Sequence, residues 1–106
     1  MPSNIDVIEH IERISPKIKT KVKKPSMWHV ILLNDDFTPM DFVVDLLMKV
    51  FCKSEIDATT IMLDIHRLGK GIAGTYTWEV AEMKVMETVE MARKAEHPLM
   101  AIIEIG

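Results

Sequence analysis

Three β-rich apolar runs alternate with three apolar stripes at helical spacing, and this order limits the folds that the chain can adopt. The runs at 27–34, 70–77 and 99–105 predict strands, which gives the order strand, helix, helix, strand, helix, strand. One sheet with helices packed against it is the simplest way to bury these stripes. The pattern leaves the strand order open. We predict an α+β fold in which a three-stranded, antiparallel sheet packs against three helices.

Capping residues mark where the predicted helices begin and end. Each helix has a residue at its start that suits the N-cap position: Thr38, Ser54 and Thr77. Pro39 suits a first helical position, Asp57 completes an acidic variant of the capping box, and Gly69 suits a left-handed helix end. The buried faces are expected to consist of Phe42, Val43, Leu46, Leu47, Val50 and Phe51, then Ala58, Ile61, Met62, Ile65 and Leu68, then Ala81, Val85, Val89 and Ala92. Two glycines within the second strand indicate a bulge or a close backbone approach.

The composition fits one soluble domain preceded by an extension. The 106 residues are 48% hydrophobic with a formal net charge of −3, so the chain can bury a modest core. A single cysteine excludes an internal disulfide, and no apolar stretch resembles a signal sequence or a membrane span. We expect a cytoplasmic protein with a flexible extension at 1–26 and a core domain at 27–106. The basic run "KIKTKVKK" lacks interleaved aromatic residues, so no nucleic-acid partner is expected.

Polar residues gather where the first strand should end: Asn34, Asp35 and Asp36. Asn and Asp favour turns because their side chains bond nearby backbone amides, so a structural turn is the simplest interpretation. His66 lies on the rim of the buried face of the second helix. If that helix packs beside the end of the first strand, the imidazole and the polar turn converge on one site.

Three uses of such a cluster can be compared. A divalent metal would accept carboxylate and imidazole ligands, but no HxH, HExxH or CxxC spacing accompanies them. An acid–base enzyme using Asp35, Asp36 and His66 is the alternative function, and it lacks a nucleophile motif or a phosphate-binding loop. Capture of a protonated amine fits best, because an ammonium group offers three donors and needs converging acceptors. Met40 and Met62 would add adaptable apolar walls.

Several spaced motifs give the chain a resemblance to the ClpS family of protease adaptors. They are "VILLNDDFTPMDFV" at 30–43, "IH" at 65–66, "GKGIAG" at 69–74 and "HPL" at 97–99. The resemblance implies an adaptor rather than an enzyme, with no catalytic residue, metal or cofactor. Such adaptors bind proteins that begin with a free bulky hydrophobic residue (Leu, Phe, Tyr or Trp). They deliver these proteins to a ClpA-type AAA+ unfoldase for degradation.

The resemblance also implies roles for individual residues. The substrate α-amino group would be bound by Asn34, Asp35, Asp36 and His66, with Asp36 nearer to the amine than Asp35. The pocket for the first side chain would be lined by Thr38, Met40, Val43, Met62, Ile65 and Leu99. Glu79 and Lys84 would dock a monomeric adaptor on the N-terminal domain of the unfoldase. Ile65 stands where the family commonly has a smaller valine, which implies a tighter pocket floor.

Overall fold

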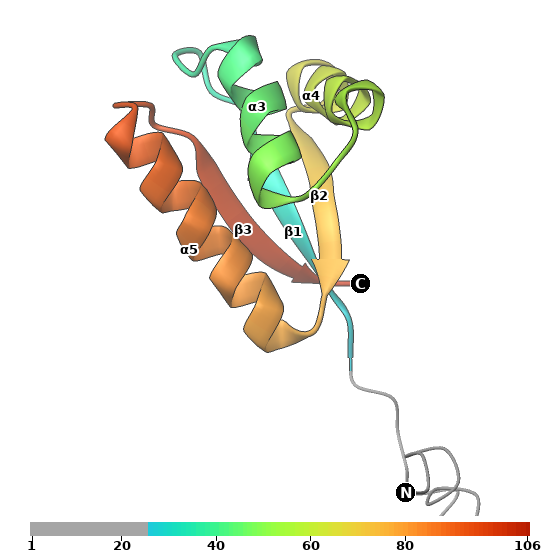
Figure 1. Cartoon of the computed structure of the whole chain (residues 1–106). Coiled ribbons are helices and arrows are strands. Elements are labelled where there is room, and N and C mark those ends of the chain that lie inside the picture. The colour runs from blue at the N-terminus through green and yellow to red at the C-terminus, as the bar shows by residue number, and fades with distance from the viewer. Residues whose placement is uncertain (1–25) are drawn as a thin grey trace, which may run out of the picture.

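The computed structural model describes residues 26–106, so the predicted extension lies outside the described residues except for its last residue. The elements are β1 (Trp28–Leu33), α3 (Met40–Val50), α4 (Glu55–Leu68), β2 (Lys70–Tyr76), α5 (Trp78–Lys94) and β3 (Met100–Ile105). The sheet has the order β2-β1-β3, and both outer strands run antiparallel to β1 (Figure 1). The predicted α+β fold with an antiparallel, three-stranded sheet is confirmed.

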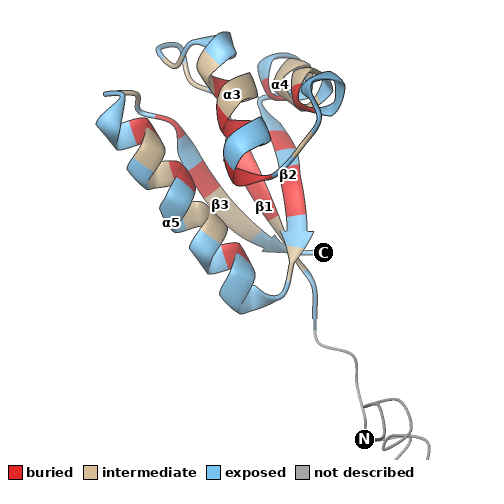
Figure 2. Ribbon diagram, viewed as in Figure 1, coloured by how far each residue is buried: buried red, intermediate tan, exposed pale blue. Residues whose placement is uncertain are grey.

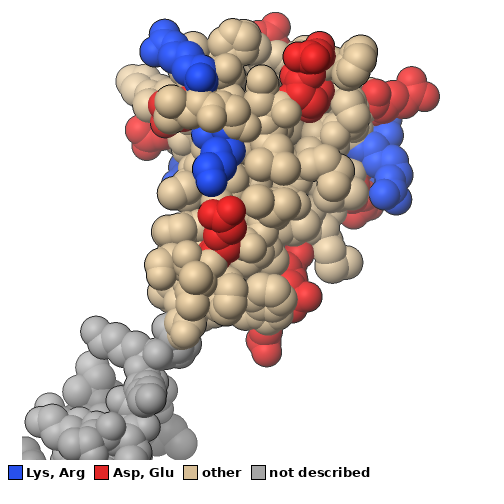
Figure 3. Space-filling view, turned by 180° about the vertical axis from the view of Figure 1, so that it is seen from behind, with Lys and Arg blue, Asp and Glu red and all other residues tan. Residues whose placement is uncertain are grey.

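The helices bury the core against one side of the sheet, with α4 at the β2 edge and α5 along β1 and β3 (Figure 1). Val30 and Leu32 of the central strand are fully buried and belong to one cluster with Leu46 and Leu47 of α3. Figure 2 shows that buried residues occur on all three strands and on all three of these helices. Figure 3 shows the opposite side of the molecule, where a broad surface carries few charged side chains. Within residues 26–106, no helix combines the length and hydropathy that crossing a membrane requires.

Local capping signals correctly predicted both ends of α4. The Oγ atom of Ser54 accepts a hydrogen bond of 3.1 Å from the backbone N–H of Asp57. Gly69 ends the helix with a φ of 87°, the left-handed conformation that glycine adopts without strain. The N–H of Gly69 donates to the carbonyl of Ile65, so the last turn of α4 is closed by a backbone bond.

Other predictions about the helices need correction. Thr38 is not the N-cap of α3: Pro39 occupies that position, and the Thr38 hydroxyl donates to Asp35 instead. Thr77 does precede α5 as its N-cap residue, but its side chain makes no capping hydrogen bond. Leu68 is 74% exposed rather than buried, because the last turn of α4 lies beside the outer face of the sheet and not in the core.

The predicted irregularity in the second strand is a bulge. The pairing of β1 with β2 shifts between Val30, which pairs with Gly74, and Ile31, which pairs with Ile72. Ala73 is therefore an extra residue on β2 and has no partner in the register. A bulge bends its strand and increases the local twist, so the glycine-rich sequence adjusts the path of the edge strand that contacts α4.

Candidate functional site

A cavity of about 230 Å³ lies between the turn that follows β1, the start of α3 and the second half of α4. Its lining residues are Asn34, Asp35, Asp36, Thr38, Met40, Val43, Met62, Ile65 and His66. Each of these residues was predicted to be a site residue from the sequence. The structure thus brings together residues that are separated by up to 32 positions in the chain and that come from three different elements.

A backbone hydrogen bond holds the polar turn beside α4. The N–H of Asn34 donates to the carbonyl oxygen of Gly69 over 2.9 Å. Asn34 directly follows β1 and Gly69 directly follows α4, so this bond joins the ends of the two elements. His66 lies in the last turn of α4, one turn before that junction. The convergence of the imidazole with the turn therefore follows from main-chain pairing.

Asp35 builds the turn itself. Its Oδ1 atom accepts hydrogen bonds from the N–H groups of Phe37 (2.8 Å) and Thr38 (2.7 Å), and its Oδ2 atom accepts the Thr38 hydroxyl at 2.7 Å. Partial burial by itself raises the pKa of Asp35, but the bonds from Thr38 and Phe37 and the nearby His97 outweigh burial and lower that pKa. Both oxygens of Asp35 are thus occupied, and the carboxylate is held in its ionised form.

Three other polar side chains of the cavity remain available to a ligand. Asn34, Asp36 and His66 are exposed, and none of the side-chain hydrogen bonds found within residues 26–106 involves them. They offer an amide oxygen, a carboxylate and an imidazole nitrogen as acceptors. The C-terminal end of α4 adds partial negative charge near His66. This mouth of the cavity therefore suits a small cation that carries several hydrogen-bond donors.

The remainder of the cavity is apolar. Val43 and Ile65 are 5% and 3% exposed and form its closed part, while Met62 is half-buried. Met40, in the first turn of α3, is 43% exposed and stands at the more open part of the lining. A concave apolar surface with a few convergent polar groups is the usual form of a ligand site. Here its volume suits one side chain rather than a larger molecule.

Leu99 is not among the residues that line this cavity, although it belongs to the same core cluster as Val43 and Ile65. It is 3% exposed within the core cluster and borders a different hollow near His97 and Pro98. Its role in the pocket for the first side chain stays a prediction.

The two predicted docking residues differ in their surroundings on α5. Glu79 is exposed in the first turn of the helix. Lys84 is partly buried, and its Nζ atom donates to the carbonyl oxygen of Val50 over 2.8 Å and lies 3.9 Å from the carboxylate of Glu87. The Lys84 side chain therefore connects α5 to the end of α3. Neither residue borders the cavity of the polar turn.

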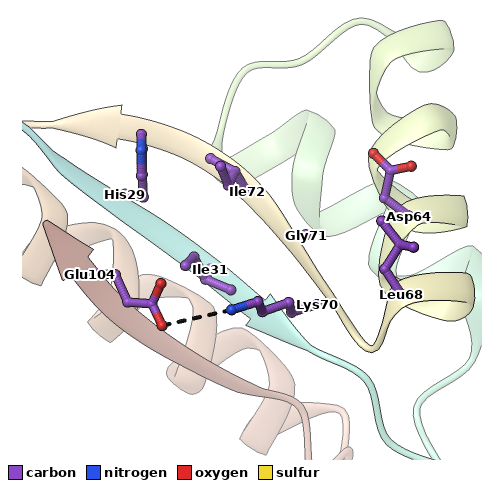
Figure 4. A pocket seen from close by; sticks show the side chains of 8 residues that line it. All are labelled: His29, Ile31, Asp64, Leu68, Lys70, Gly71, Ile72 and Glu104. Carbon is purple, nitrogen blue, oxygen red and sulfur yellow. Dashed lines mark ion pairs between the residues drawn. The ribbon is translucent and has the colours of Figure 1, made fainter. Parts of the chain in front are cut away.

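A second and larger hollow, of about 410 Å³, lies on the outer face of the sheet (Figure 4). Its apolar lining comes mainly from Ile31, Ile72 and Leu68, and the side chains of Lys70 and Glu104 form an ion pair of 4.0 Å across it. None of the predicted site residues lines this hollow. Its polar lining consists of His29 and of charged residues of both signs, Asp64, Lys70 and Glu104, rather than a set of converging acceptors, so the smaller cavity is the better candidate for a ligand site.

The residues present do not form an evident metal centre. Within the part of the chain that the structure describes, no group of three or more His, Cys, Asp or Glu side chains is arranged to hold a metal ion. Asp35, Asp36 and His66 are the three candidate metal ligands, and both carboxylate oxygens of Asp35 already accept hydrogen bonds within the turn. The glycines of the second strand indicated a bulge or a close backbone approach, but the sequence did not show which residue is approached. In the structure, Gly71 of β2 lies against Ile65 of the cavity wall.

Comparison with known proteins assigns the chain to a family. The family model described as ATP-dependent Clp protease adaptor protein ClpS matches residues 23–102. The ATP-dependent Clp protease adapter protein ClpS of Maricaulis maris is 47% identical over 97 residues, which are 92% of this chain and 89% of that protein. The protein of the same name from Bartonella quintana is 48% identical over 101 residues, covering 95% of this chain and 92% of the relative.

A solved structure supports the same assignment. Agrobacterium tumefaciens ClpS2 bound to L-phenylalaninamide superposes with a TM-score of 0.75 and 35% sequence identity, covering 78% of this chain and 100% of the other. Family and fold therefore agree, and the alternative of a small metal-dependent or acid–base enzyme is set aside. This chain belongs to the ClpS family of ATP-dependent Clp protease adaptor proteins, which are adaptors and not catalysts.

Proposed function

We propose that this adaptor binds proteins that begin with a free, bulky hydrophobic residue (Leu, Phe, Tyr or Trp) and delivers them to a ClpA-type AAA+ unfoldase. One observation carries the proposal: three available acceptors stand at the mouth of an apolar cavity that suits one side chain. An α-ammonium group and the side chain of the same residue are joined through one carbon atom. A chain start with both features can therefore fill the polar mouth and the apolar interior together.

The ammonium group supplies the specificity for a free chain start. Its three N–H donors match acceptors on Asn34, Asp36 and His66, and Asp35 keeps the turn in shape. Each charge-assisted hydrogen bond contributes about 1.5–3 kcal/mol. An acetylated chain start has lost the positive charge and two of the donors. It would leave the polar groups at the mouth of the cavity without partners.

The first side chain supplies the apolar part of the binding free energy. Burying a Leu- or Phe-sized side chain among Val43, Met62 and Ile65 contributes about 1.5–3 kcal/mol. Ordering of the peptide opposes binding. An affinity in the micromolar range, roughly −8 kcal/mol, is expected. L-Phenylalaninamide, the ligand of the Agrobacterium relative, likewise combines a free α-amino group with an aromatic side chain.

Delivery requires a second surface. We assign docking on the N-terminal domain of the unfoldase to Glu79 and Lys84 of a monomeric adaptor, with hand-over assisted by the extension at 1–26, of which the structure describes only residue 26. Both docking residues are on α5, away from the cavity, so the adaptor can hold a substrate and its unfoldase at the same time. An ATP-dependent protease works where ATP is supplied, so we place the adaptor in the cytoplasm.

A peptide titration tests the proposal. Fluorescently labelled peptides that differ only in the first residue (Leu, Phe, Trp, Ile or acetyl-Leu) are titrated with the full chain and followed by anisotropy. We expect micromolar binding of Leu, Phe and Trp peptides and at least tenfold weaker binding of the Ile peptide, whose β-branch meets Met40. The acetylated peptide should not bind. Binding of acetyl-Leu as tightly as free Leu would refute amine recognition.

A further inference from the structure

Residue 71 has room for a hydrogen atom but not for a side chain. A Cβ atom built on Gly71 would lie 2.8 Å from Cγ1 of Ile65 and 3.2 Å from the carbonyl oxygen of Ile61. Carbon atoms that are not bonded to each other pack at about 3.5–4.0 Å. Because Gly71 has no Cβ atom, α4 can approach β2 closely at this residue. Figure 4 shows β2 at Gly71 passing beside the helix that carries Asp64 and Leu68.

Ile65 lies between this glycine and the cavity of the polar turn. It is 3% exposed, it belongs to the core cluster, and it is one of the residues that line the cavity. Protein cores are close-packed, so a displaced side chain moves where free volume exists. For Ile65, which otherwise packs within the core cluster, that free volume is the cavity that it lines. Pressure from the strand would therefore push Ile65 into the space meant for a ligand.

We propose that Gly71 is a specificity-determining positioning residue, which holds Ile65 back from the cavity and so sets the size of the first side chain that fits. Gly71 does not touch the ligand; it acts through Ile65. The inference deepens the proposed function and rests on it for the identity of the ligand.

The contact between Gly71 and Ile65 can be tested by adding a methyl group at residue 71 and removing the Cδ1 methyl group at residue 65. Gly71→Ala adds a methyl on the strand side, and Ile65→Val removes one on the helix side, so the double variant conserves the total volume. Gly74→Ala is the matched control. It makes the same change in the same strand, but its Cβ would meet the ring of Tyr76, which does not line the cavity.

The readout is the ratio of affinities for Trp-initiated and Leu-initiated peptides, measured with the full chain. One methylene in an apolar pocket changes discrimination by about tenfold or more. We expect Gly71→Ala to weaken Trp binding relative to Leu by about that factor. We expect Ile65→Val to change the ratio in the opposite direction, and the double variant to return within about threefold of the original ratio. Gly74→Ala should leave the ratio unchanged.

A measurement without peptide separates this inference from the proposed function. The NMR signal of the Ile65 δ1 methyl group should move in Gly71→Ala and stay in place in Gly74→Ala. If peptides fail to bind the original chain, the proposed function is refuted, and the methyl signal alone decides the contact. If Gly71→Ala does not fold, the Trp/Leu ratios of Ile65→Val and of the double variant are compared with that of the original chain. An unchanged Trp/Leu ratio in folded Gly71→Ala, or an equal change in Gly74→Ala, overturns the proposal.

Discussion

The backbone N–H of Asn34 and the carbonyl oxygen of Gly69 form a hydrogen bond of 2.9 Å that joins the end of β1 to the end of α4. The polar turn begins at one partner, and the imidazole of His66 lies three residues before the other. The acceptors of the site are therefore positioned by main-chain atoms from two distant parts of the chain. Any change that moves either partner should alter stability and ligand binding together.

Replacing Gly69 tests this coupling. Its φ of 87° is strained for a residue with a Cβ, so Gly69→Ala should destabilise the fold by about 1 kcal/mol. No atom lies within 4 Å of the added Cβ, so the loss reflects backbone strain rather than a clash. Peptide affinity should fall as well, because the turn is attached to this residue. Urea denaturation and anisotropy measure the two effects, and Gly69→Asn is the milder control. An alanine variant as stable as the original chain would contradict the interpretation.

The two neighbouring aspartates should respond differently to removal of their charge. Asp35→Ala removes three hydrogen bonds that build the turn, so it should lower the free energy of unfolding by about 1–3 kcal/mol and abolish binding. Asp36→Ala removes an exposed ligand acceptor, so it should weaken peptide binding at least tenfold and leave stability nearly unchanged. Thermal unfolding and peptide titration of both variants make the comparison. Equal losses of stability would show that the turn depends on both carboxylates.

Peptide binding should weaken as the pH falls from 7.5 to 5.0, because the proposed contact needs an unprotonated imidazole at His66 as an acceptor. Protonated His66 would donate instead of accepting and would repel the ammonium group. The lowered pKa of Asp35 means that its stabilising contribution is present above the ordinary Asp value of about 3.9 and is lost only as pH falls through the folded-state pKa below it. The turn should therefore remain folded throughout this pH range.

Anisotropy between pH 7.5 and 5.0, with circular dichroism at each pH, separates loss of binding from unfolding. The loss should reach about tenfold, the equivalent of about 1.4 kcal/mol. In His66→Asn, affinity should be weaker at pH 7.5 and almost independent of pH. Equal affinity of the original chain and of His66→Asn for Leu peptides at pH 7.5 would rule out the imidazole as an acceptor.

Substitutions of Lys84 and Glu79 should differ in their effect on the stability of the fold. Lys84→Ala removes a partly buried contact to the carbonyl of Val50, so it should destabilise the fold by about 1–2 kcal/mol and weaken docking on the unfoldase. Glu79→Ala alters an exposed residue and should affect docking alone. Denaturation curves and a pull-down with the isolated N-terminal domain of the unfoldase compare the two variants. Neither substitution should change peptide affinity, because both residues lie outside the cavity.

The parts of the fold that the sequence predicted well depend on interactions within a few residues. The capping of α4 by Ser54 and its end at Gly69 are local in this sense, as are the strand and helix stripes. Thr38 shows the limit of such reasoning. As an N-cap its hydroxyl oxygen would accept a bond from a backbone N–H of the first turn, but here the hydroxyl donates to the Asp35 carboxylate and Pro39 is the N-cap residue. Two local motifs competed there, and residue type alone did not decide between them.

Tertiary structure decided which elements and residues contact each other. The sequence by itself determined the six elements and the polar turn, because residue chemistry and periodicity are encoded along the chain, and its resemblance to a known family implied the residues that line the cavity. It did not determine the strand order β2-β1-β3, nor that Gly71 lies against Ile65. These facts depend on contacts between segments far apart in sequence, whose geometry is fixed only when the sheet and helices pack as a whole.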